Sequence, residues 1–361
     1  MSLSTLLRSI MIGALAVCVS ACGGGSAAPT PPPSTTTKFA FVTNFVAGTV
    51  SIFSVDSQTG QLTPKSSVPT GGINPKVIAV EPSGRFAYVG HQASNNISVL
   101  AINATTGNLT AVGSPVPAGA GPRFVAVGPT GRFLYAADLD EDHISGFSID
   151  PNSGALTALG TVATDHAPVA ICFDPAGQFA YVVNFGSGDV TVYRVGAAGE
   201  LGLLGAIPDA PNPTAIAIHP SGKFAYVSHT GSNDVTLFLR NPNTGGLTPV
   251  SPTIPTQDGP TSLTIDAQGR FAYVTNTNSG TVSVFAIDAA GNGRLTPSST
   301  ANAGTNPVAL SLDAAGRFAY VANIGSNNVT VFSVDPTAGA LTLAGAPVNA
   351  GTNPAWVAFS R

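Results

Sequence analysis

Seven aligned positions in this 361-residue sequence carry either an asparagine or a side chain that can transfer a proton. They follow seven similar stretches, such as RFAYVG and RFLYAA, and they are Asn44, His91, Asp138, Asn184, His229, Asn276 and Asn323. The asparagines are typical caps of a following turn, which is a structural role. Histidine and carboxylate can act as general bases or acids, so His91, Asp138 and His229 are candidate catalytic residues. Asn184, in the same alignment, is a candidate substrate contact.

A second aligned set follows a proline in each repeat, and only two of its members are cationic. The set is Lys76, Arg123, Val169, Thr214, Thr261, Val308 and Ala355. Fixed positive charges can bind a carboxylate or phosphate, or stabilise an oxyanion. Arg123 is therefore a candidate catalytic residue, and Lys76 and the nearby His166 are candidate substrate-binding residues. The alternative is that the two cations pair with neighbouring acids on a solvated rim.

One repeat contains DLDEDH where the others have a small, neutral loop. Asp138, Asp140 and Asp142 alternate as in a calcium-binding loop. His143 stands where an EF-hand needs glycine, and Ile149 where it needs glutamate, so an EF-hand is excluded. A looser Ca²⁺ site, or a transition-metal site that includes His143, stays open. The preferred interpretation places Asp138 in a metal-free site without a cofactor and leaves the other acids on the surface.

Both aligned sets belong to a repeat that occurs seven times. Its units begin at Lys38, Arg85, Arg132, Gln178, Lys223, Arg270 and Arg317, which are 45 to 47 residues apart. Each unit contains short alternating or apolar runs separated by Gly, Pro and Asn turns, a pattern that predicts four antiparallel strands. A repeat of this length made only of strands is typical of a propeller. We therefore predict an all-β, seven-bladed β-propeller over residues 38–361.

The two ends of the repeat region are predicted to share one blade. The first unit lacks the apolar run that precedes the others, and PAWVAFSR at 354–361 has no unit of its own. This last segment would supply the missing inner strand, in a three-plus-one closure that removes free sheet edges. The loops that meet the inner strand on one face then bring several polar residues to one mouth of the channel: Lys76, His91, Arg123, the DLDEDH run, Asp165, His166, Asp209 and His229.

Several short motifs resemble those of a known family. YVTN at 273–276, FVTN at 41–44 and PSGRFAYV at 82–89 resemble the seven-bladed lactonase family, which includes propeller-type 6-phosphogluconolactonases and carboxymuconate-cyclising enzymes. The resemblance covers residues 38–361, and it is more specific for the fold than for the activity because the shared residues build blades. It implies a lactonase-like hydrolase that opens a cyclic ester at the propeller mouth.

In such a site His91 or His229 would take a proton from water, and Asp138 would orient a histidine. Arg123, helped by Lys76, would stabilise the oxyanion. The expected partner is a small lactone or sugar-derived ligand, although phosphogluconolactone itself is a cytoplasmic metabolite and does not suit an exported chain. The alternative function is a non-catalytic YVTN propeller at the cell surface that binds a ligand or a protein partner on one face.

The N-terminal segment is predicted to direct export and anchoring. Residues 1–21 carry one arginine, an apolar stretch and small residues before Cys22, which is the layout of a secretory signal. The run from Val19 to Gly23 resembles a bacterial lipobox, in which cleavage leaves Cys22 as a lipidated N-terminus. Residues 22–37, rich in Gly, Ser and Pro, would form a tether. We expect lipid anchoring in the cell envelope, at the outer membrane or its periplasmic or extracellular face, with ordinary secretion as the alternative.

Composition restricts the remaining classes of function. Charged residues make up 9% of the chain, the formal net charge is −4 and no basic run occurs, so there is no footprint for nucleic acid. No apolar stretch of spanning length follows the N-terminal segment, so the only membrane contact expected is through the lipid. With Cys18 in the signal and Cys22 lipidated, Cys172 stays unpaired, and its place in PVAICFDP is typical of a small buried hydrophobic side chain.

Overall fold

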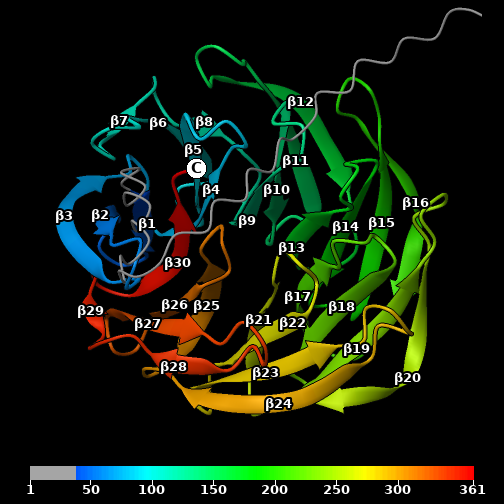
Figure 1. Ribbon diagram of the computed structural model, residues 1–361. Coiled ribbons are helices and arrows are strands. Elements are labelled where there is room, and N and C mark those ends of the chain that lie inside the picture. Colours follow the sequence, from blue (N-terminus) through cyan, green and yellow to red (C-terminus); the bar gives the residue numbers. More distant parts are fainter. Residues whose placement is uncertain (1–37) are drawn as a thin grey trace, which may run out of the picture. The chain divides into compact units, whose positions relative to one another are not determined.

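The computed structural model describes residues 38–361, which form seven antiparallel sheets arranged as blades around a central channel (Figure 1). The predicted seven-bladed all-β propeller is confirmed. The predicted signal, lipobox and tether, residues 1–37, lie outside the described residues. Among residues 38–361, no helix is long and apolar enough to cross a membrane.

Each blade places its strands in the same order from the channel to the rim. The inner strand begins at a proline and carries the apolar run of the repeat. The seven inner strands are β30 (Pro354–Phe359), β4 (Pro75–Val80), β9 (Pro122–Val127), β13 (Pro168–Phe173), β17 (Pro213–Ile218), β21 (Pro260–Ile265) and β25 (Pro307–Leu312). The second strand carries the aromatic FAYV pattern. These strands are β1 (Lys38–Asn44), β5 (Phe86–His91), β10 (Phe133–Asp138), β14 (Phe179–Asn184), β18 (Phe224–His229), β22 (Phe271–Asn276) and β26 (Phe318–Asn323).

The third strand alternates β-branched residues with small or polar ones, as a strand covered by neighbours does. The third strands are β2 (Thr49–Val55), β6 (Asn96–Ile102), β11 (His143–Ile149), β15 (Asp189–Val195), β19 (Asp234–Arg240), β23 (Thr281–Ile287) and β27 (Asn328–Val334). The outer strand faces solvent and is the most exposed of the four. Five blades have a continuous outer strand: β3 (Leu62–Pro69), β12 (Leu156–Ala163), β16 (Leu201–Pro208), β20 (Leu247–Pro255) and β24 (Leu295–Asn302).

In two blades the outer strand is broken into two short pieces, which departs from the four strands predicted for every blade. The pieces are β7 (Leu109–Ala111) with β8 (Val116–Pro117), and β28 (Leu341–Leu343) with β29 (Val348–Asn349). Between the pieces lie Gly113 and Pro115 in one blade and Gly345 and Pro347 in the other. Both glycines have a positive φ, and each proline has no N–H to donate to the ladder.

The ring closes as predicted, because β30 pairs with β1 and completes the first blade. In Figure 1 the C-terminal strand, in red, lies beside the first strands, in blue. The register places Val42 opposite Val357. β30 also contacts the inner strands β25 and β4 of the two adjacent blades, so every inner strand has a neighbour on each side.

Neighbouring blades are joined by a tyrosine that recurs in the second strand. Its hydroxyl donates to the carbonyl of a glycine in a turn of the next blade, in the pairs Tyr88–Gly154, Tyr135–Gly199, Tyr181–Gly245, Tyr226–Gly293 and Tyr320–Gly60. The last pair joins the seventh blade to the first, at 2.8 Å. A phenylalanine ring packs against each glycine so closely that a Cβ there would clash. The repeat therefore specifies the angle between blades as well as the blades themselves.

Candidate functional site

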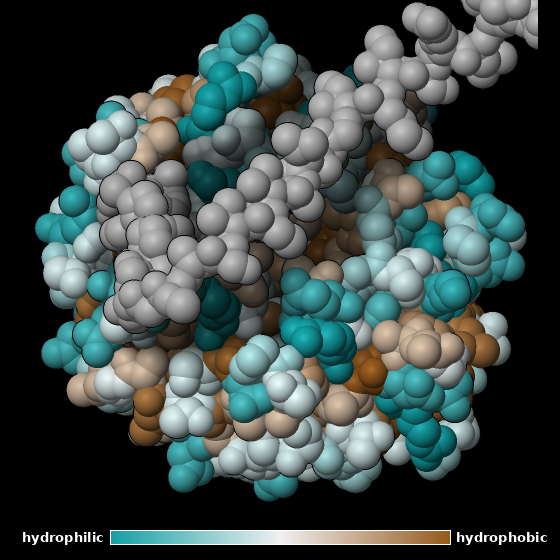
Figure 2. All heavy atoms as spheres, viewed as in Figure 1, coloured by the Kyte–Doolittle hydropathy of each residue, from teal (hydrophilic) through white to brown (hydrophobic). Residues whose placement is uncertain are grey.

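The centre of the ring contains a cavity of about 250 Å³. All seven residues that follow the proline of an inner strand, the second aligned set of the sequence, line it: Lys76, Arg123, Val169, Thr214, Thr261, Val308 and Ala355. On the face drawn in Figure 2, the rim of the ring is mostly hydrophilic, and hydrophobic residues are visible in the hollow at its centre. This cavity is therefore a pocket built by the innermost strands of the blades.

A β-bulge at the start of each inner strand turns these side chains toward the channel. In the second blade, Pro75 pairs with His91 and Val77 pairs with Gly90, so that Lys76 has no partner of its own. The same register shift leaves Arg123 unpaired in the third blade. Because a bulge inserts one extra residue, it re-aims a side chain that a regular pleat would point elsewhere.

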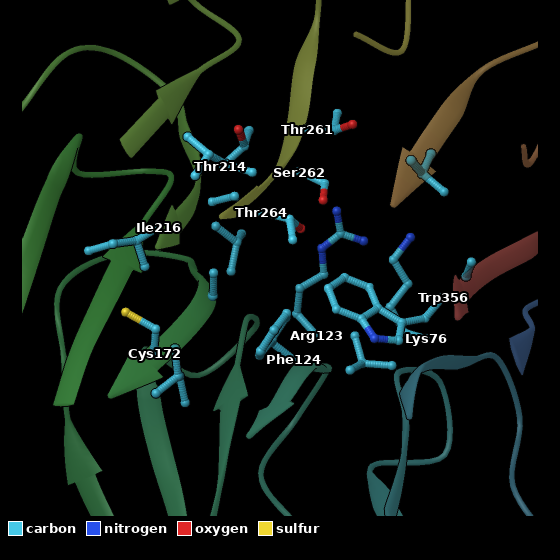
Figure 3. Close-up of a pocket in the computed structure, with 18 residues that line it drawn as sticks. Lys76, Arg123, Phe124, Cys172, Thr214, Ile216, Thr261, Ser262, Thr264 and Trp356 are labelled. Atoms are coloured by element: carbon cyan, nitrogen blue, oxygen red, sulfur yellow. The ribbon is translucent and has the colours of Figure 1, made fainter. Parts of the chain in front are cut away.

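The two cations of the cavity lie on adjacent blades and lack counter-ions. Figure 3 shows Lys76 and Arg123 projecting into the same side of the cavity, where Trp356 also lies. Among residues 38–361, no carboxylate forms an ion pair with either side chain. Burial, reinforced by the charge of Arg123, lowers the pKa of Lys76 to about 7. Burial also lowers the pKa of Arg123. The cavity therefore concentrates positive charge that no acid of the described chain neutralises.

Two aromatic side chains form the floor beside the cations. Phe124 and Trp356 lie on β9 and β30 and meet edge to face, with ring centroids 5.3 Å apart. Both line the cavity. The other blades have Val77, Ala170, Ala215, Ser262 and Ala309 at this third position of the inner strand. Sequence reasoning missed these two residues, although a large aromatic where the repeat has a small residue was the available signal.

The wall opposite the cations carries hydroxyl groups that already donate to neighbouring strands. Thr214 donates to the carbonyl of Pro260 at 2.8 Å, and Thr264 donates to that of Leu310 at 2.9 Å. Each of these bonds runs from one inner strand to the next, so the hydroxyls brace the ring. Their oxygen atoms can still accept a hydrogen bond from a ligand, but their hydrogens are donated to the backbone carbonyls.

Four of the seven sequence-predicted site residues lie between strands and not in the cavity. His91, Asp138, Asn184 and His229, at the ends of their second strands, are 0% exposed. The ring of His91 lies against Gly72, and its Nδ1 is 3.3 Å from the carbonyl of Asn96. Burial lowers the pKa of His91 to about 4.

Asp138 and Asn184 contact the third strand of their own blades. Ser145 donates to Asp138 at 2.6 Å, and burial raises the pKa of Asp138 to about 6. The side-chain amide of Asn184 donates to Asp189 at 2.6 Å and to Thr191 at 2.7 Å. These bonds hold the end of the second strand to the third strand. The sequence predicted that the asparagines cap the following turn, whereas Asn184 donates to two side chains of the next strand.

His229 occupies the same position in the fifth blade and lies between two carboxylates. Its Nε2 is 2.7 Å from Asp209 and its Nδ1 is 3.1 Å from Asp234. The histidine side chain is 0% exposed and that of Asp209 is 2% exposed. Each ring nitrogen of His229 is thus within hydrogen-bond distance of one carboxylate. The group is a cluster of one histidine and two carboxylates, and none of its members lines the cavity.

The DLDEDH run, residues 138–143, forms the turn between β10 and β11. Asp142 has a φ of 56°, and its carboxylate accepts from the backbone N–H of Ala167 at 2.7 Å. Asn95, Asn233 and Asn327 have the same positive φ and the same kind of bond to the next blade. His166 is 3.1 Å from Asp142, is 70% exposed, and does not line the cavity. Asp142 thus stands where three other blades have an asparagine in the left-handed conformation, and it makes the same bond to the next blade.

A match to a family model accounts for the whole ring. The model "Lactonase, 7-bladed beta-propeller" matches residues 34–125, 121–308 and 260–359. The chain belongs to this lactonase family. No curated protein matches the chain in sequence.

Solved structures similar to this lactonase-family chain share its fold at low identity. A candidate 6-phosphogluconolactonase from Bacteroides uniformis has a TM-score of 0.82 and 21% identity, over 90% of this chain and 100% of that one. A corresponding protein from Bacteroides fragilis has a TM-score of 0.80 and 20% identity, over 91% and 99%. The periplasmic gluconolactonase PpgL from Pseudomonas aeruginosa has a TM-score of 0.80 and 20% identity, over 90% and 99%.

The structure also places the possible metal ligands and the cysteine of this lactonase-family propeller. Among residues 38–361, no group of three His, Cys, Asp or Glu side chains is placed to hold a metal ion, so Asp138, Asp140, Asp142 and His143 do not form such a group. Cys172 lines the cavity, where the sequence predicted a buried core residue, and burial raises the pKa of its thiol. Of the sequence-predicted site residues, the cavity thus brings together Lys76 and Arg123.

Proposed function

We propose that this protein is a lactone hydrolase whose active site is the central cavity, with Arg123 and Lys76 as its reacting groups. The observation that carries the proposal is the pair of uncompensated cations. Two positive charges placed side by side in a partly desolvated cavity cost free energy unless an anion joins them. Perturbed groups in a concave pocket are typical of functional sites. In a family of lactonases, an oxyanion and the product carboxylate are the anions that fit.

Lys76 is the proposed general base. A lysine with a pKa of about 7 is about half neutral at neutral pH, and its free amine can accept a proton. Arg123 remains charged and is the proposed oxyanion donor. His91, Asp138 and His229 have other contacts, so this proposal replaces the histidine bases of the sequence-based hypothesis by Lys76.

The proposed reaction uses one water molecule and no redox step. Water attacks the carbonyl carbon while one of its protons moves to Nζ of Lys76. Arg123 stabilises the tetrahedral oxyanion. The ring C–O bond then breaks, Lys76 returns the proton to the leaving oxygen, and the product is a hydroxy acid.

Measuring kcat/KM for a panel of lactones as a function of pH tests this assignment. Activity should rise with pH through about 7 as Lys76 loses its proton, and it should be lost below that value. Lys76→Arg keeps the charge but cannot deprotonate in this range, so it should abolish turnover. The control Lys65→Arg, on the exposed outer strand β3, should behave like the parent. Full activity in Lys76→Arg would contradict the role of Lys76.

A second candidate function is binding of an organic anion without turnover. It is favoured by the composition of the cavity, whose described lining contains no carboxylate and no imidazole. Absence of hydrolysis across the panel, together with saturable anion binding that Arg123→Ala weakens, would support this function over catalysis. A chelator present during the assay separates both functions from a metal-dependent one, because loss of activity with chelator would require an ion.

Export and lipid anchoring complete the proposal. The support is the lipobox-like run from Val19 to Gly23 and the Gly/Ser/Pro-rich segment after it. Each acyl CH₂ placed in the bilayer contributes about 0.8 kcal/mol to membrane binding. Replacing Cys22 by serine should release the protein from the membrane fraction, and unchanged partition would contradict lipidation.

A further inference from the structure

We infer that the cavity selects a lactone with a hydrophobic body, an aryl- or alkyl-substituted ring, and rejects polyhydroxylated sugar lactones. This inference deepens the proposed function and rests on it, because it names the substrate class of the same site. Two features carry it: how few hydrogen-bond partners the cavity offers to substrate hydroxyls, and the aromatic floor beside the cations.

The polar groups of the cavity cannot satisfy a ligand with many hydroxyls. Its lining contains no Asn, Gln, Asp, Glu or His among residues 38–361. The hydroxyls of Thr214 and Thr264 already donate to the carbonyls of the next inner strand. The hydroxyl of Thr261 is 2.7 Å from that of Thr277, behind the cavity wall. The side-chain donors left without an acceptor among the described residues are thus Lys76, Arg123, the hydroxyl of Ser262, which only accepts from Leu310 N–H, and the indole N–H of Trp356. These are few for a ligand with many hydroxyls.

The rest of the cavity is apolar. Phe124 and Trp356 form the floor, and the edge-to-face contact between their rings sets both in place. The walls between the cations and the hydroxyls consist of Val77, Val169, Ala170, Ile171, Ala215, Ile216, Leu263, Val308 and Ala355. A flat hydrophobic ring can contact the aromatic floor while its carbonyl group reaches Arg123 (Figure 3).

The expected discrimination follows from desolvation. Each sugar hydroxyl that enters this cavity loses its bonds to water and gains few in return, whereas an aryl or alkyl group gains from burial. A site without matching polar groups therefore disfavours a polyhydroxylated substrate in both the ground state and the transition state. The similar structures described as 6-phosphogluconolactonases and a gluconolactonase have sugar-acid names, so this cavity would separate the chain from the activity those names indicate.

The first experiment compares kcat/KM for dihydrocoumarin and γ-nonalactone with that for glucono-δ-lactone, using residues 38–361 as one chain. We expect the hydrophobic lactones to be preferred by at least about 100-fold. Equal values, or a preference for gluconolactone, would overturn the inference while leaving lactone hydrolysis standing. Absence of hydrolysis for every lactone would count against the proposed function, and the second experiment then decides the inference.

The second experiment measures binding without turnover. Trp356 is the only tryptophan of the chain, so its fluorescence reports directly on the cavity floor. Phenylpropanoate and hexanoate should change the emission with a Kd at least about tenfold lower than that of gluconate. A Kd for gluconate equal to or lower than those of the hydrophobic acids would overturn the inference, whether or not the protein is an enzyme.

A substitution in the floor links the preference to the structure. Phe124→Ala should reduce the preference for dihydrocoumarin over gluconolactone by about tenfold, because it removes the ring that packs on Trp356. Leu203→Ser, at a 62% exposed position of the outer strand β16, is the matched control and should leave the preference unchanged. If Phe124→Ala unfolds the chain, Phe124→Leu keeps the volume apolar without the aromatic face and should lower the affinity for phenylpropanoate more than that for hexanoate. An unchanged preference in both Phe124 variants would contradict the role of the floor.

Discussion

Two groups of residues break the seven-fold repeat with ionisable side chains, and the fold treats them in opposite ways. Lys76 and Arg123 follow the first residue of their inner strands and face the cavity, and no carboxylate of residues 38–361 forms an ion pair with them. His91, Asp138 and His229 end second strands and are 0% exposed. Lys76 directly follows the proline that pairs with His91, so the two groups meet at the same end of the blade.

The difference comes from the number of neighbours that each strand has. An inner strand has the channel on one side, and the bulge after its proline turns one side chain toward it. A second strand has a strand on each side and a blade on each face, and all six of its positions from Phe86 to His91 are buried. A departure from a repeat therefore indicates function only where the fold gives that position access to a ligand.

The largest expected effect is on stability, at His229. His229→Leu leaves the buried carboxylate of Asp209 and the partly buried one of Asp234 without the imidazole that contacts both, and breaking such a cluster costs about 3–5 kcal/mol. Urea unfolding of the variant should show this loss. His91→Asn, which restores the residue found in four other blades, is the matched control and should keep both stability and activity. If the His229→Leu protein instead kept the parental stability and lost turnover, His229 would have a catalytic role. The distinction between the cavity residues and the buried residues would then be wrong.

The next effect is on catalysis, at Arg123. Arg123→Ala should lower kcat/KM for the best lactone by about two or more orders of magnitude, the usual consequence of losing an oxyanion donor. Its unfolding curve should match that of the parent. Arg132→Ala, on the exposed start of a repeat, removes the same type of side chain away from the cavity and should retain activity. Equal kcat/KM values for the two variants would contradict a catalytic role for Arg123.

A smaller effect, dependent on pH, is expected at Asp138. Burial raises the pKa of Asp138 from 3.8 to about 6, so the folded protein binds this proton more tightly than the unfolded chain does. That contribution to stability is complete below pH 3.8 and is lost as the pH rises through about 6. Asp138→Asn mimics the protonated form and should stabilise the protein at neutral pH by at most about 3 kcal/mol.

Thermal unfolding of Asp138→Asn and the parent at several pH values checks this prediction. The gain in Tm should shrink to nothing below about pH 4, where the parent aspartate is also protonated. Loss of turnover with full stability in Asp138→Asn would instead assign a catalytic carboxylate to a position that the cavity does not reach.

The smallest effect concerns the tyrosines between blades. Tyr320→Phe removes the 2.8 Å bond to Gly60 across the ring closure and should cost about 1 kcal/mol. The hydroxyl of Tyr273 has no partner among the described residues, so Tyr273→Phe should cost less. Phe41 holds the same position in the first blade without a hydroxyl. Equal losses in the two variants, measured by urea unfolding, would show that partners do not determine the contribution of a buried polar group.

The repeat made the blades and the ring of cavity residues predictable. Aligned positions in a propeller have equivalent environments, so the place of Lys76 and Arg123 after the proline groups them with the five other members of that aligned set, all of which line the cavity. The orphan segment that became β30 was predictable for the same reason, because a ring of seven blades leaves no free edge.

Other features depend on contacts between blades, which a repeat alignment does not contain. The direction of the side chains of His91 and His229 depends on which faces the neighbouring blades cover, and the cluster around His229 requires Asp209 from a loop 20 residues earlier. Phe124 and Trp356 are brought together only by the closing of the ring. An alignment assigns each residue to a strand position, but burial and unpaired charge arise from the packing of distant segments, and these determine which of the ionisable residues can meet a ligand.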